Sequence, residues 1–200
     1  PFFPLVKFYH RHYTNMVLDG LKQSFGVFWD FIEAIVFALA IFVVCYLFLF
    51  QPNQVKQHSM EPTYHDSEYI LTDKISYRLG MPKRGDVVVF RSPKNAEVDF
   101  IKRIIGLPGE KIKIKAGKVY INGDILDESA YLDPSVYTGS ESSLAENTES
   151  LIPDGHYFTM GDNRTQSSDS RDFGPVKPSE FVGKVFFRYW PIDRFGLLPQ

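Results

Sequence analysis

The pattern of apolar and polar positions divides the chain into an apolar N-terminal run and a longer body of short alternating segments. Residues 34–50 carry no charge, and with residues 31–33 the run reaches the roughly 20 residues needed to cross a bilayer. The run exceeds the ~7–15 residues of a secretory signal core, and residues 51–54 offer no small-residue cleavage site. The pattern therefore predicts a transmembrane helix over residues 31–50 that stays attached as an anchor.

The segment before this helix is aromatic and mildly basic. Residues 1–30 show no clear periodicity until about Val17, so we predict a short tail that leads into the helix. Three Lys or Arg residues precede the helix, whereas only Lys56 lies within the twenty residues after it. The positive-inside bias then predicts residues 1–30 in the cytoplasm and residues 51–200 on the extracytoplasmic side. Because the chain starts at Pro1 and not at Met, we also expect it to be a fragment or to have lost residues at its start.

The body is predicted to be mainly β. Short alternating runs rich in Val, Ile, Phe and Tyr are typical of strands, and they occur at residues 68–72, 87–90, 100–105, 111–115, 118–121, 156–160 and 182–190. The pair around Gly117 predicts a hairpin. Residues 127–150 are rich in Ser, Glu and Asp with little apolar pattern, which predicts a mobile surface loop.

Charge and cysteine content exclude some classes of protein. Twenty-two basic and 24 acidic residues give a net charge of -2, which favours neither a nucleic-acid binder nor an acidic tail. The one cysteine, Cys45, lies in the apolar run, so no disulfide can form within the chain. Neither a metal-ligand spacing nor a phosphate-binding glycine loop is present, so we expect no metal and no cofactor.

Candidate chemistry begins at Ser59, in a turn fixed by Pro62 just after the apolar run. A serine between an anchor and a folded body is placed like a nucleophile close to a membrane, although an ordinary turn serine fits the same stretch. His58 is a poor base because adjacent side chains in an extended segment point opposite ways. His65 and His156 lie in no recognisable serine-hydrolase context, and there is no Gly-x-Ser-x-Gly motif.

Lys102 is the better candidate for the base. Strand alternation places it on the same apolar face as Phe100 and Ile104, with Arg103 on the other face. Deprotonating an ordinary lysine at pH 7 costs about 4.6 kcal/mol, and burial can shift the pKa down by about 3–5 units, which is enough. The alternative is a lysine that reaches past the apolar face to water.

Four segments in order resemble those of bacterial type I signal peptidases. They read SMEPT at 59–63, RGDVVVF at 84–90, IKRIIGLPGE at 101–110 and GDNRTQSSDSR at 161–171. The resemblance covers residues 25 to 198. It implies coiled antiparallel β-sheets that form one catalytic domain behind the anchor. It also implies an endopeptidase that removes signal peptides from exported preproteins after small residues, of the Ala-x-Ala type, by a Ser-Lys dyad and an acyl-enzyme.

By motif position, the resemblance makes Ser59 the nucleophile and Lys102 the general base. Ser167 takes the place of a serine that hydrogen-bonds the lysine amine. Asp169 and Arg171 take the place of a supporting ion pair, since two residues in an extended segment share a face. The turn that carries Ser167 is assigned to Gly161, Asp162 and Asn163, and Arg164 receives no role.

The resemblance leaves the oxyanion site open. The Ser59 backbone N–H is one donor, but the second donor position, a Ser, Thr or Gly in many relatives, is Gln57 here. Its N–H or its side-chain amide could serve. Shallow pockets for small substrate residues would be lined by Met60, Phe100 and Ile101, with the substrate bound as an extended strand along a sheet edge.

The partners implied are preprotein signal peptides, the lipid bilayer and a nearby secretion translocon, at a bacterial cytoplasmic membrane crossed once. The apolar end at residues 195–198, with Trp190, could dock on lipid or pack as a terminus. Three alternatives stay open. They are a Ser-Lys autoprotease of the repressor-cleaving kind, a non-catalytic anchored β-domain, and the homologous peptidase of a mitochondrial inner membrane.

Overall fold

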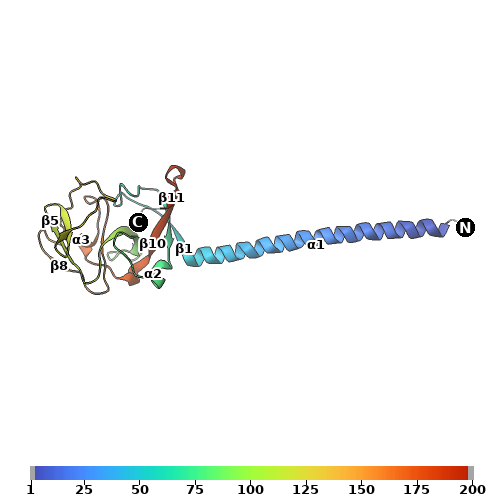
Figure 1. Cartoon of the computed structure of the whole chain (residues 1–200), viewed down its shortest axis with the longest axis horizontal. Helices are drawn as coiled ribbons and strands as arrows, with labels where there is room; N and C mark the ends of the chain where they lie inside the picture. Colours follow the sequence, from blue (N-terminus) through green and yellow to red (C-terminus); the bar gives the residue numbers. More distant parts are fainter. Residues whose placement is uncertain (1–2, 198–200) are drawn as a thin grey trace. The chain divides into compact units, whose positions relative to one another are not determined.

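The computed structural model describes the backbone of residues 3–197 and the side chains of residues 26–197, which form an N-terminal unit up to Phe48 and a body from Leu49. Helix α1 spans Phe3–Leu49 (Figure 1). The helix therefore starts well before Val17, and the predicted tail is helical from Phe3. No proline occurs between Pro4, which the first turn of a helix tolerates, and Pro52, so nothing in this stretch interrupts the backbone hydrogen bonds.

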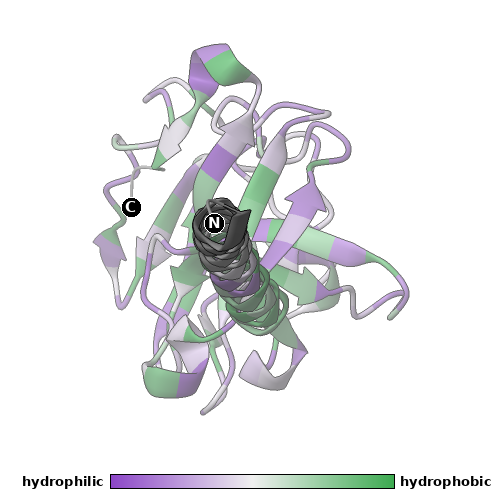
Figure 2. Cartoon of the chain, turned by 90° about the vertical axis from the view of Figure 1, so that its right-hand side faces the viewer, coloured by the Kyte–Doolittle hydropathy of each residue, from purple (hydrophilic) through white to green (hydrophobic). Residues whose placement is uncertain are grey.

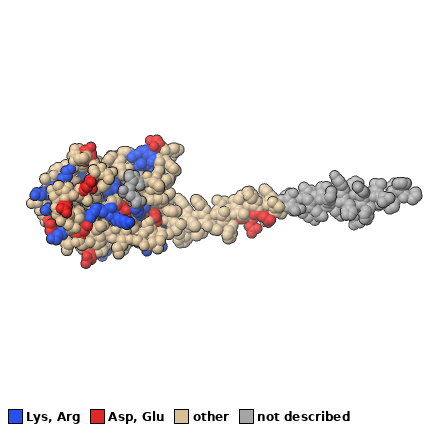
Figure 3. Space-filling model, in the orientation of Figure 1, with Lys and Arg blue, Asp and Glu red and all other residues tan. Residues whose placement is uncertain are grey.

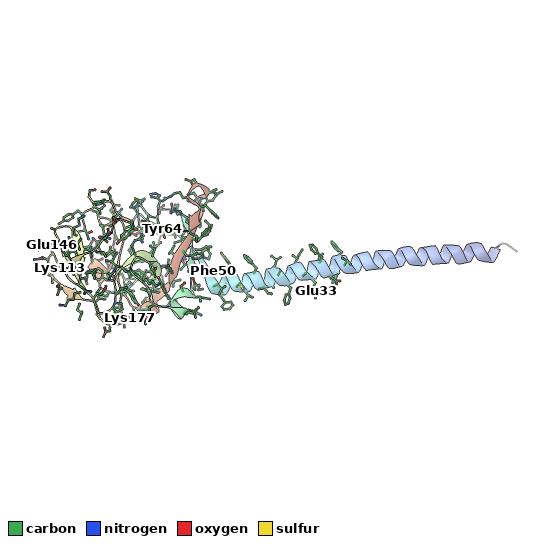
Figure 4. The ribbon with its side chains drawn as sticks, in the orientation of Figure 1. Glu33, Phe50, Tyr64, Lys113, Glu146 and Lys177 are labelled. Atoms are coloured by element: carbon green, nitrogen blue, oxygen red, sulfur yellow. The ribbon has the colours of Figure 1, made fainter. Side chains whose placement is uncertain are left out.

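The C-terminal half of α1 has the properties of a membrane span. Its segment Gly26–Leu49 is long and apolar enough to cross a bilayer, and none of it is buried inside the protein. Figure 2 shows these turns as mainly hydrophobic, and Figures 3 and 4 place the acidic side chains, Glu33 among them, near the start of the segment. Such a helix is stable where lipid covers its sides. The basic side chains before residue 25, on which the predicted orientation depends, lie outside the described side chains.

The larger sheet of the body is antiparallel throughout, with the strand order β1-β2-β10-β3-β4-β9 and β11 paired to β10. Its strands are β1 (Phe50–Gln54), β2 (Tyr69–Asp73), β3 (Val87–Arg91), β4 (Asp99–Gly106), β9 (Phe158–Met160), β10 (Phe181–Trp190) and β11 (Gly196–Leu197). Short helices α2 (Ser76–Leu79) and α3 (Ser170–Phe173) and two single 3₁₀ turns, Pro178–Glu180 and Ile192–Arg194, complete the connections around this sheet.

The smaller sheet has the order β7-β6-β5-β8, formed by β5 (Lys111–Lys115), β6 (Lys118–Ile121), β7 (Asp124–Ile125) and β8 (Ser150–Leu151). The predicted hairpin at Gly117 is confirmed. Ala116 and Gly117 have φ angles of 50° and 75°, as expected for a two-residue turn between twisted strands. Ile112 and Ile114 on β5 point into a core, while Lys111 and Lys115 face solvent.

The prediction of a mainly β body is confirmed, and each predicted strand overlaps an observed one. Strand β1 was not predicted, because Phe50 is its one large apolar side chain and it contains Pro52. It forms nonetheless, since it pairs with β2 along its whole length at the edge of the sheet.

Residues 127–150 are mainly exposed and almost without regular structure, as predicted for a surface loop, but Leu132, Thr138 and Leu144 are buried and anchor the segment. Leu144 is 1% exposed and packs in the core with Ile112 and Ile114. The backbone N–H of Asn147 donates to the Ile114 carbonyl, and Ser143 donates to the carbonyl of Arg171. The buried apolar residues of this segment occur singly between polar residues, so no periodic pattern in the sequence predicted their burial.

We expect Leu144→Ala to lower the free energy of unfolding of the body by about 2–5 kcal/mol, as for other buried leucines. The matched control is Leu151→Ala, because Leu151 is 62% exposed and loses little packing. Chemical denaturation of both variants in detergent compares the two. Equal stability of the variants would contradict the packing of this segment.

Candidate functional site

Ser59 lies in the connection between β1 and β2. Backbone hydrogen bonds between Val55 and Glu68 and between Ser67 and Val55 close the neck of this connection. Within it, the N–H of Tyr64 donates to the Met60 carbonyl, which turns the chain directly after Ser59. The Met60 and Tyr64 side chains are buried beneath this turn, so the position of Ser59 is tied to the core.

Lys102 meets Ser59 from the middle of β4. Its Nζ lies 2.6 Å from Ser59 Oγ, within hydrogen-bond distance, and its side chain is 3% exposed. The ammonium also lies 5.3 Å from the centre of the Phe100 ring, on the face that strand alternation indicated. The structure thus brings together two residues 43 positions apart in the sequence.

The surroundings of Lys102 shift its ionisation toward the neutral form. Burial lowers the pKa of Lys102 from 10.5 to about 8, against the carboxylates of Asp169 and Asp162, which raise it, while Arg171 lowers it further. At pH 7 the neutral fraction is then roughly 10%, compared with roughly 0.03% for an ordinary lysine. A neutral amine beside a serine hydroxyl can accept its proton, which is the arrangement of a nucleophile with its general base.

The histidines considered as bases are engaged elsewhere. His58 Nδ1 and His65 Nδ1 lie 2.8 and 3.5 Å from one oxygen of Glu61, at the surface. His156 Nδ1 bonds the Asp154 carbonyl. Within the part of the chain whose side chains are described, no histidine hydrogen-bonds Ser59, so Lys102 is the base that the geometry offers.

The turn at Gly161 contacts the Ser59 turn directly. The N–H of Asn163 donates to the Ser59 carbonyl at 3.1 Å, and the Asn163 side-chain amide donates to the His58 carbonyl at 3.1 Å. A Cβ atom at Gly161 would lie 2.4 Å from the Ser59 carbonyl oxygen and 2.2 Å from Ser167 Oγ. Only glycine therefore lets this turn approach the serine so closely.

We expect Gly161→Ala to lower the free energy of unfolding by about 1–3 kcal/mol, because the methyl group is forced against backbone and a buried hydroxyl. Gly139→Ala is the control, since nothing lies within 4 Å of its Cβ position and its φ is not positive. Thermal unfolding of the two variants tests the contact. If Gly161→Ala is as stable as Gly139→Ala, the close contact between Gly161 and the Ser59 carbonyl is refuted.

Ser167 does not make its expected hydrogen bond. Its Oγ is buried beside Gly161, and no polar partner for it, Lys102 included, is found in the described part of the chain. The hydroxyl is thus near the dyad without bonding the lysine amine. The predicted hydrogen bond from Ser167 to the Lys102 amine is therefore absent from this structure, in which Lys102 Nζ is directed at Ser59.

The expected ion pair between Asp169 and Arg171 forms, with Arg171 Nη2 2.8 Å from Asp169 Oδ2 and both side chains buried. The segment is not extended, however. Asp169 caps α3 by accepting from the Arg171 N–H, and its carboxylate also accepts from the Gly161 N–H at 3.0 Å. The pair therefore links α3 to the turn under Ser59, which supports its structural assignment.

A second buried pair was missed by sequence reasoning. Arg103 binds both oxygens of Asp162, at 2.9 and 2.7 Å, and Thr63 Oγ1 donates to the same carboxylate at 2.5 Å. These contacts tie the end of the Ser59 turn to β4. Arg103 follows Lys102 and faces the opposite side among apolar neighbours, which is the signal that could have indicated a buried partner.

Arg164, to which no role was assigned from the sequence, is also buried and paired. Its guanidinium binds Glu128 and donates to Thr138 Oγ1 at 2.8 Å. Tyr131, close to Glu128 in sequence, stacks on Arg103, with the guanidinium carbon 4.1 Å from the ring centre. Segment 127–150 is thereby fastened to the turn that follows β9.

A groove of about 210 Å³ opens in front of the dyad. One wall comes from residues 53–57 and the other from residues 98–102, with Ile70 and Val89 between them. Both walls are sheet edges. β1 is the outermost strand, and β9 pairs with β4 from Arg103 onward, so among the described strands nothing pairs with the outer side of residues 99–102.

The residues that line the groove can be compared with those predicted to line a substrate pocket. Phe100 and Ile101 line it, as expected. Met60 does not line the groove in this structure, because its side chain is fully buried in the core beneath the Ser59 turn. Gln57 lines the groove, but its backbone N–H donates to Asp66 Oδ1 at 2.7 Å, which leaves the side-chain amide as the donor it can offer.

Metal-ligand clusters and charged surface patches are the other features that could mark a functional site. Within residues 26–197, no three His, Cys, Asp or Glu side chains are grouped so as to hold a metal ion. The visible surface carries Lys and Arg intermixed with Asp and Glu (Figure 3). The dyad and its groove are therefore the site to compare with known proteins.

Comparison with known proteins gives consistent matches. A family model described as signal peptidase, peptidase S26, matches residues 28–190. A probable signal peptidase I-2 from Synechocystis is 40% identical over 156 residues, which are 76% of this chain and 68% of the relative. Signal peptidase IB from Staphylococcus aureus is 37% identical over 177 residues, 83% of this chain and 91% of the relative. A solved signal peptidase I from Enterococcus faecalis is 32% identical, with a TM-score of 0.43 over 52% of this chain and 97% of that one.

Proposed function

The chain belongs to the signal peptidase family, peptidase S26, as a serine endopeptidase, and from this premise we propose that Ser59 and Lys102 form its catalytic dyad. The substrate is an exported preprotein, cut after a small residue to release its N-terminal signal peptide. The observation that carries the proposal is the 2.6 Å distance between Lys102 Nζ and Ser59 Oγ at a buried lysine.

The reaction follows from the positions of these two side chains. Neutral Lys102 takes the proton of Ser59 as Oγ attacks the scissile carbonyl, and the resulting ammonium gives that proton to the leaving amine of the mature protein. The signal peptide stays bound to Oγ as an ester, the acyl-enzyme. A water molecule activated by Lys102 then hydrolyses the ester, which frees the signal peptide and restores Ser59.

The negative charge on the attacked carbonyl oxygen needs donors that are already in place. The Ser59 backbone N–H serves as one. The Gln57 side-chain amide serves as the second, because the Gln57 backbone N–H is used by Asp66. This assignment explains how a chain without Ser, Thr or Gly at that position can complete an oxyanion site.

The substrate binds as an extended strand between the two walls of the groove. The unpaired edges of residues 53–57 and 99–102 supply backbone donors and acceptors to it, as in other cases of strand addition. Phe100 and Ile101 limit the room for its side chains near the scissile bond. Small residues such as those of an Ala-x-Ala site fit this limited space.

The membrane is the second partner. We propose that α1 crosses the bilayer once at Gly26–Leu49, with the N-terminus in the cytoplasm and the body on the extracytoplasmic side of a bacterial membrane. Aromatic side chains near the C-terminal end of the described chain, Trp190 and Phe195, are more than half exposed and face lipid headgroups. Leu198, part of the predicted apolar end, lies outside the described residues.

The purified chain of residues 1–200 in detergent tests this function. We expect it to cleave a preprotein with an Ala-x-Ala site and to leave uncut the same preprotein with Phe at the residue before the cut. Ser59→Ala should cut neither. No cleavage by the wild type would favour a non-catalytic β-domain, and cleavage of its own chain alone would favour an autoprotease.

A further inference from the structure

Gln57 has an unusual backbone conformation. Its φ angle is 71°, in the left-handed region that non-glycine residues seldom adopt. It lies two residues before Ser59 and lines the groove beside Ser59 and Lys102. A strained backbone conformation of this kind persists only where neighbouring residues hold it in place.

Asp66 is the neighbour that fixes it. Its Oδ1 accepts the Gln57 backbone N–H at 2.7 Å, and its Oδ2 accepts the Ser67 hydroxyl at 2.9 Å. Ser67 in turn bonds Val55 across the neck of the nucleophile connection. One oxygen of the carboxylate therefore holds Gln57 across the neck of the connection, and the other is held by the neighbouring Ser67.

We propose that Asp66 is a positioning residue, which holds Gln57 in the left-handed conformation so that the Gln57 side-chain amide donates to the oxyanion. This inference rests on the proposed function and assigns a role within that same site. Because the carboxylate occupies the Gln57 N–H, Gln57 can supply the second donor only through its side chain. The same hydrogen bond sets the direction in which the side chain leaves the backbone.

The role depends on a hydrogen-bond acceptor and not on a charge. Asp66→Asn keeps an acceptor oxygen for the Gln57 N–H and removes the charge, whereas Asp66→Ala removes both. We expect Asp66→Ala to lower kcat on an Ala-x-Ala preprotein by about tenfold with little change in KM, because the donor is misplaced in the transition state. Asp66→Asn should retain activity within about twofold of the wild type.

A double-mutant cycle separates positioning from general support of the loop. Gln57→Gly removes the amide, and we expect kcat to fall by about 10²-fold, as for loss of one oxyanion donor. In this background Asp66→Ala should cause less than about a twofold further loss, since nothing remains for Asp66 to position. Asp133→Ala is the matched control, because Asp133 is an exposed carboxylate that accepts from the N–H and hydroxyl of Ser135 far along the chain.

The chain of residues 1–200 in detergent is assayed for all variants, with thermal unfolding measured alongside. The proposal is overturned if Asp66→Ala keeps wild-type kcat, if Asp66→Asn falls as far as Asp66→Ala, or if the loss persists undiminished in the Gln57→Gly background. A wild type that cuts no preprotein would instead refute the proposed function itself.

Discussion

Lys102→Met is expected to lower kcat/KM for preprotein cleavage by about 10³- to 10⁴-fold and, at pH 7, to make the body more stable than the wild type. Methionine fills a similar length of the apolar face but has no amine to accept the Ser59 proton. Activity is measured on an Ala-x-Ala preprotein, and stability by chemical denaturation in detergent.

The gain in stability follows from the pKa of Lys102. Its folded value of about 8 lies below the ordinary 10.5, so between these two pH values the unfolded chain binds more protons than the folded one. The cost of the buried ammonium is therefore fully present below about pH 8 and is relieved as the pH rises toward 10.5. The shift corresponds to about 3 kcal/mol, which Lys102→Met removes at pH 7.

The stability difference between Lys102→Met and the wild type should then shrink as the pH approaches 10.5. Lys113→Met is the control, since Lys113 is a half-buried strand lysine whose ammonium lies 5.5 Å from the Tyr120 ring, remote from Ser59. It should keep full activity. A Lys102→Met variant that is active, or that is less stable than the wild type at pH 7, would contradict this account of the lysine.

Asp169→Asn is expected to lower the free energy of unfolding by about 3–5 kcal/mol, because Arg171 is left buried without its counter-charge. Asp169 accepts the Gly161 N–H on Oδ2 and the Arg171 N–H on Oδ1, so asparagine, with one oxygen, keeps one of these two bonds and loses the charge. Asp169 also raises the pKa of Lys102, and Arg171 lowers it. Without the carboxylate the activity profile should therefore shift to lower pH.

Glu149→Gln serves as the control for Asp169→Asn, since it breaks an exposed pair with Lys111. Such pairs contribute little, and no clear loss of stability is expected. Denaturation curves and pH–activity profiles of both variants give the comparison. A shift of the Asp169→Asn profile to higher pH would mean that the carboxylate does not act on Lys102 as described.

Strand alternation predicted the face on which Lys102 lies, and the family motifs predicted its partner. Both pieces of information are local, because a side chain in a strand has two directions and the motifs are contiguous. Met60 shows the limit of such reasoning. It follows Ser59 directly, yet the turn closed by Tyr64 sends its side chain into the core and not into the groove. Proximity in sequence could not fix that direction.

The parts that the sequence did not predict depend on distant pairing. β1 is polar and contains Pro52, and it is a strand because β2 lies beside it. Segment 127–150 is held by single anchors, Leu144 in the core and Glu128 on Arg164. The residues that contact these anchors come from other parts of the chain, so the local sequence of this segment could not predict them.

The pH dependence of kcat/KM for the wild type on an Ala-x-Ala preprotein tests the central claim most directly, because it reports the ionisation of the free enzyme's essential base. We expect activity to rise about tenfold per pH unit at low pH and to level off around the pKa of Lys102, about 8. A midpoint near 6.5, the ordinary pKa of histidine, or a rise that continues to about pH 10, as for an unburied lysine, would contradict the claim that a buried, neutral Lys102 activates Ser59.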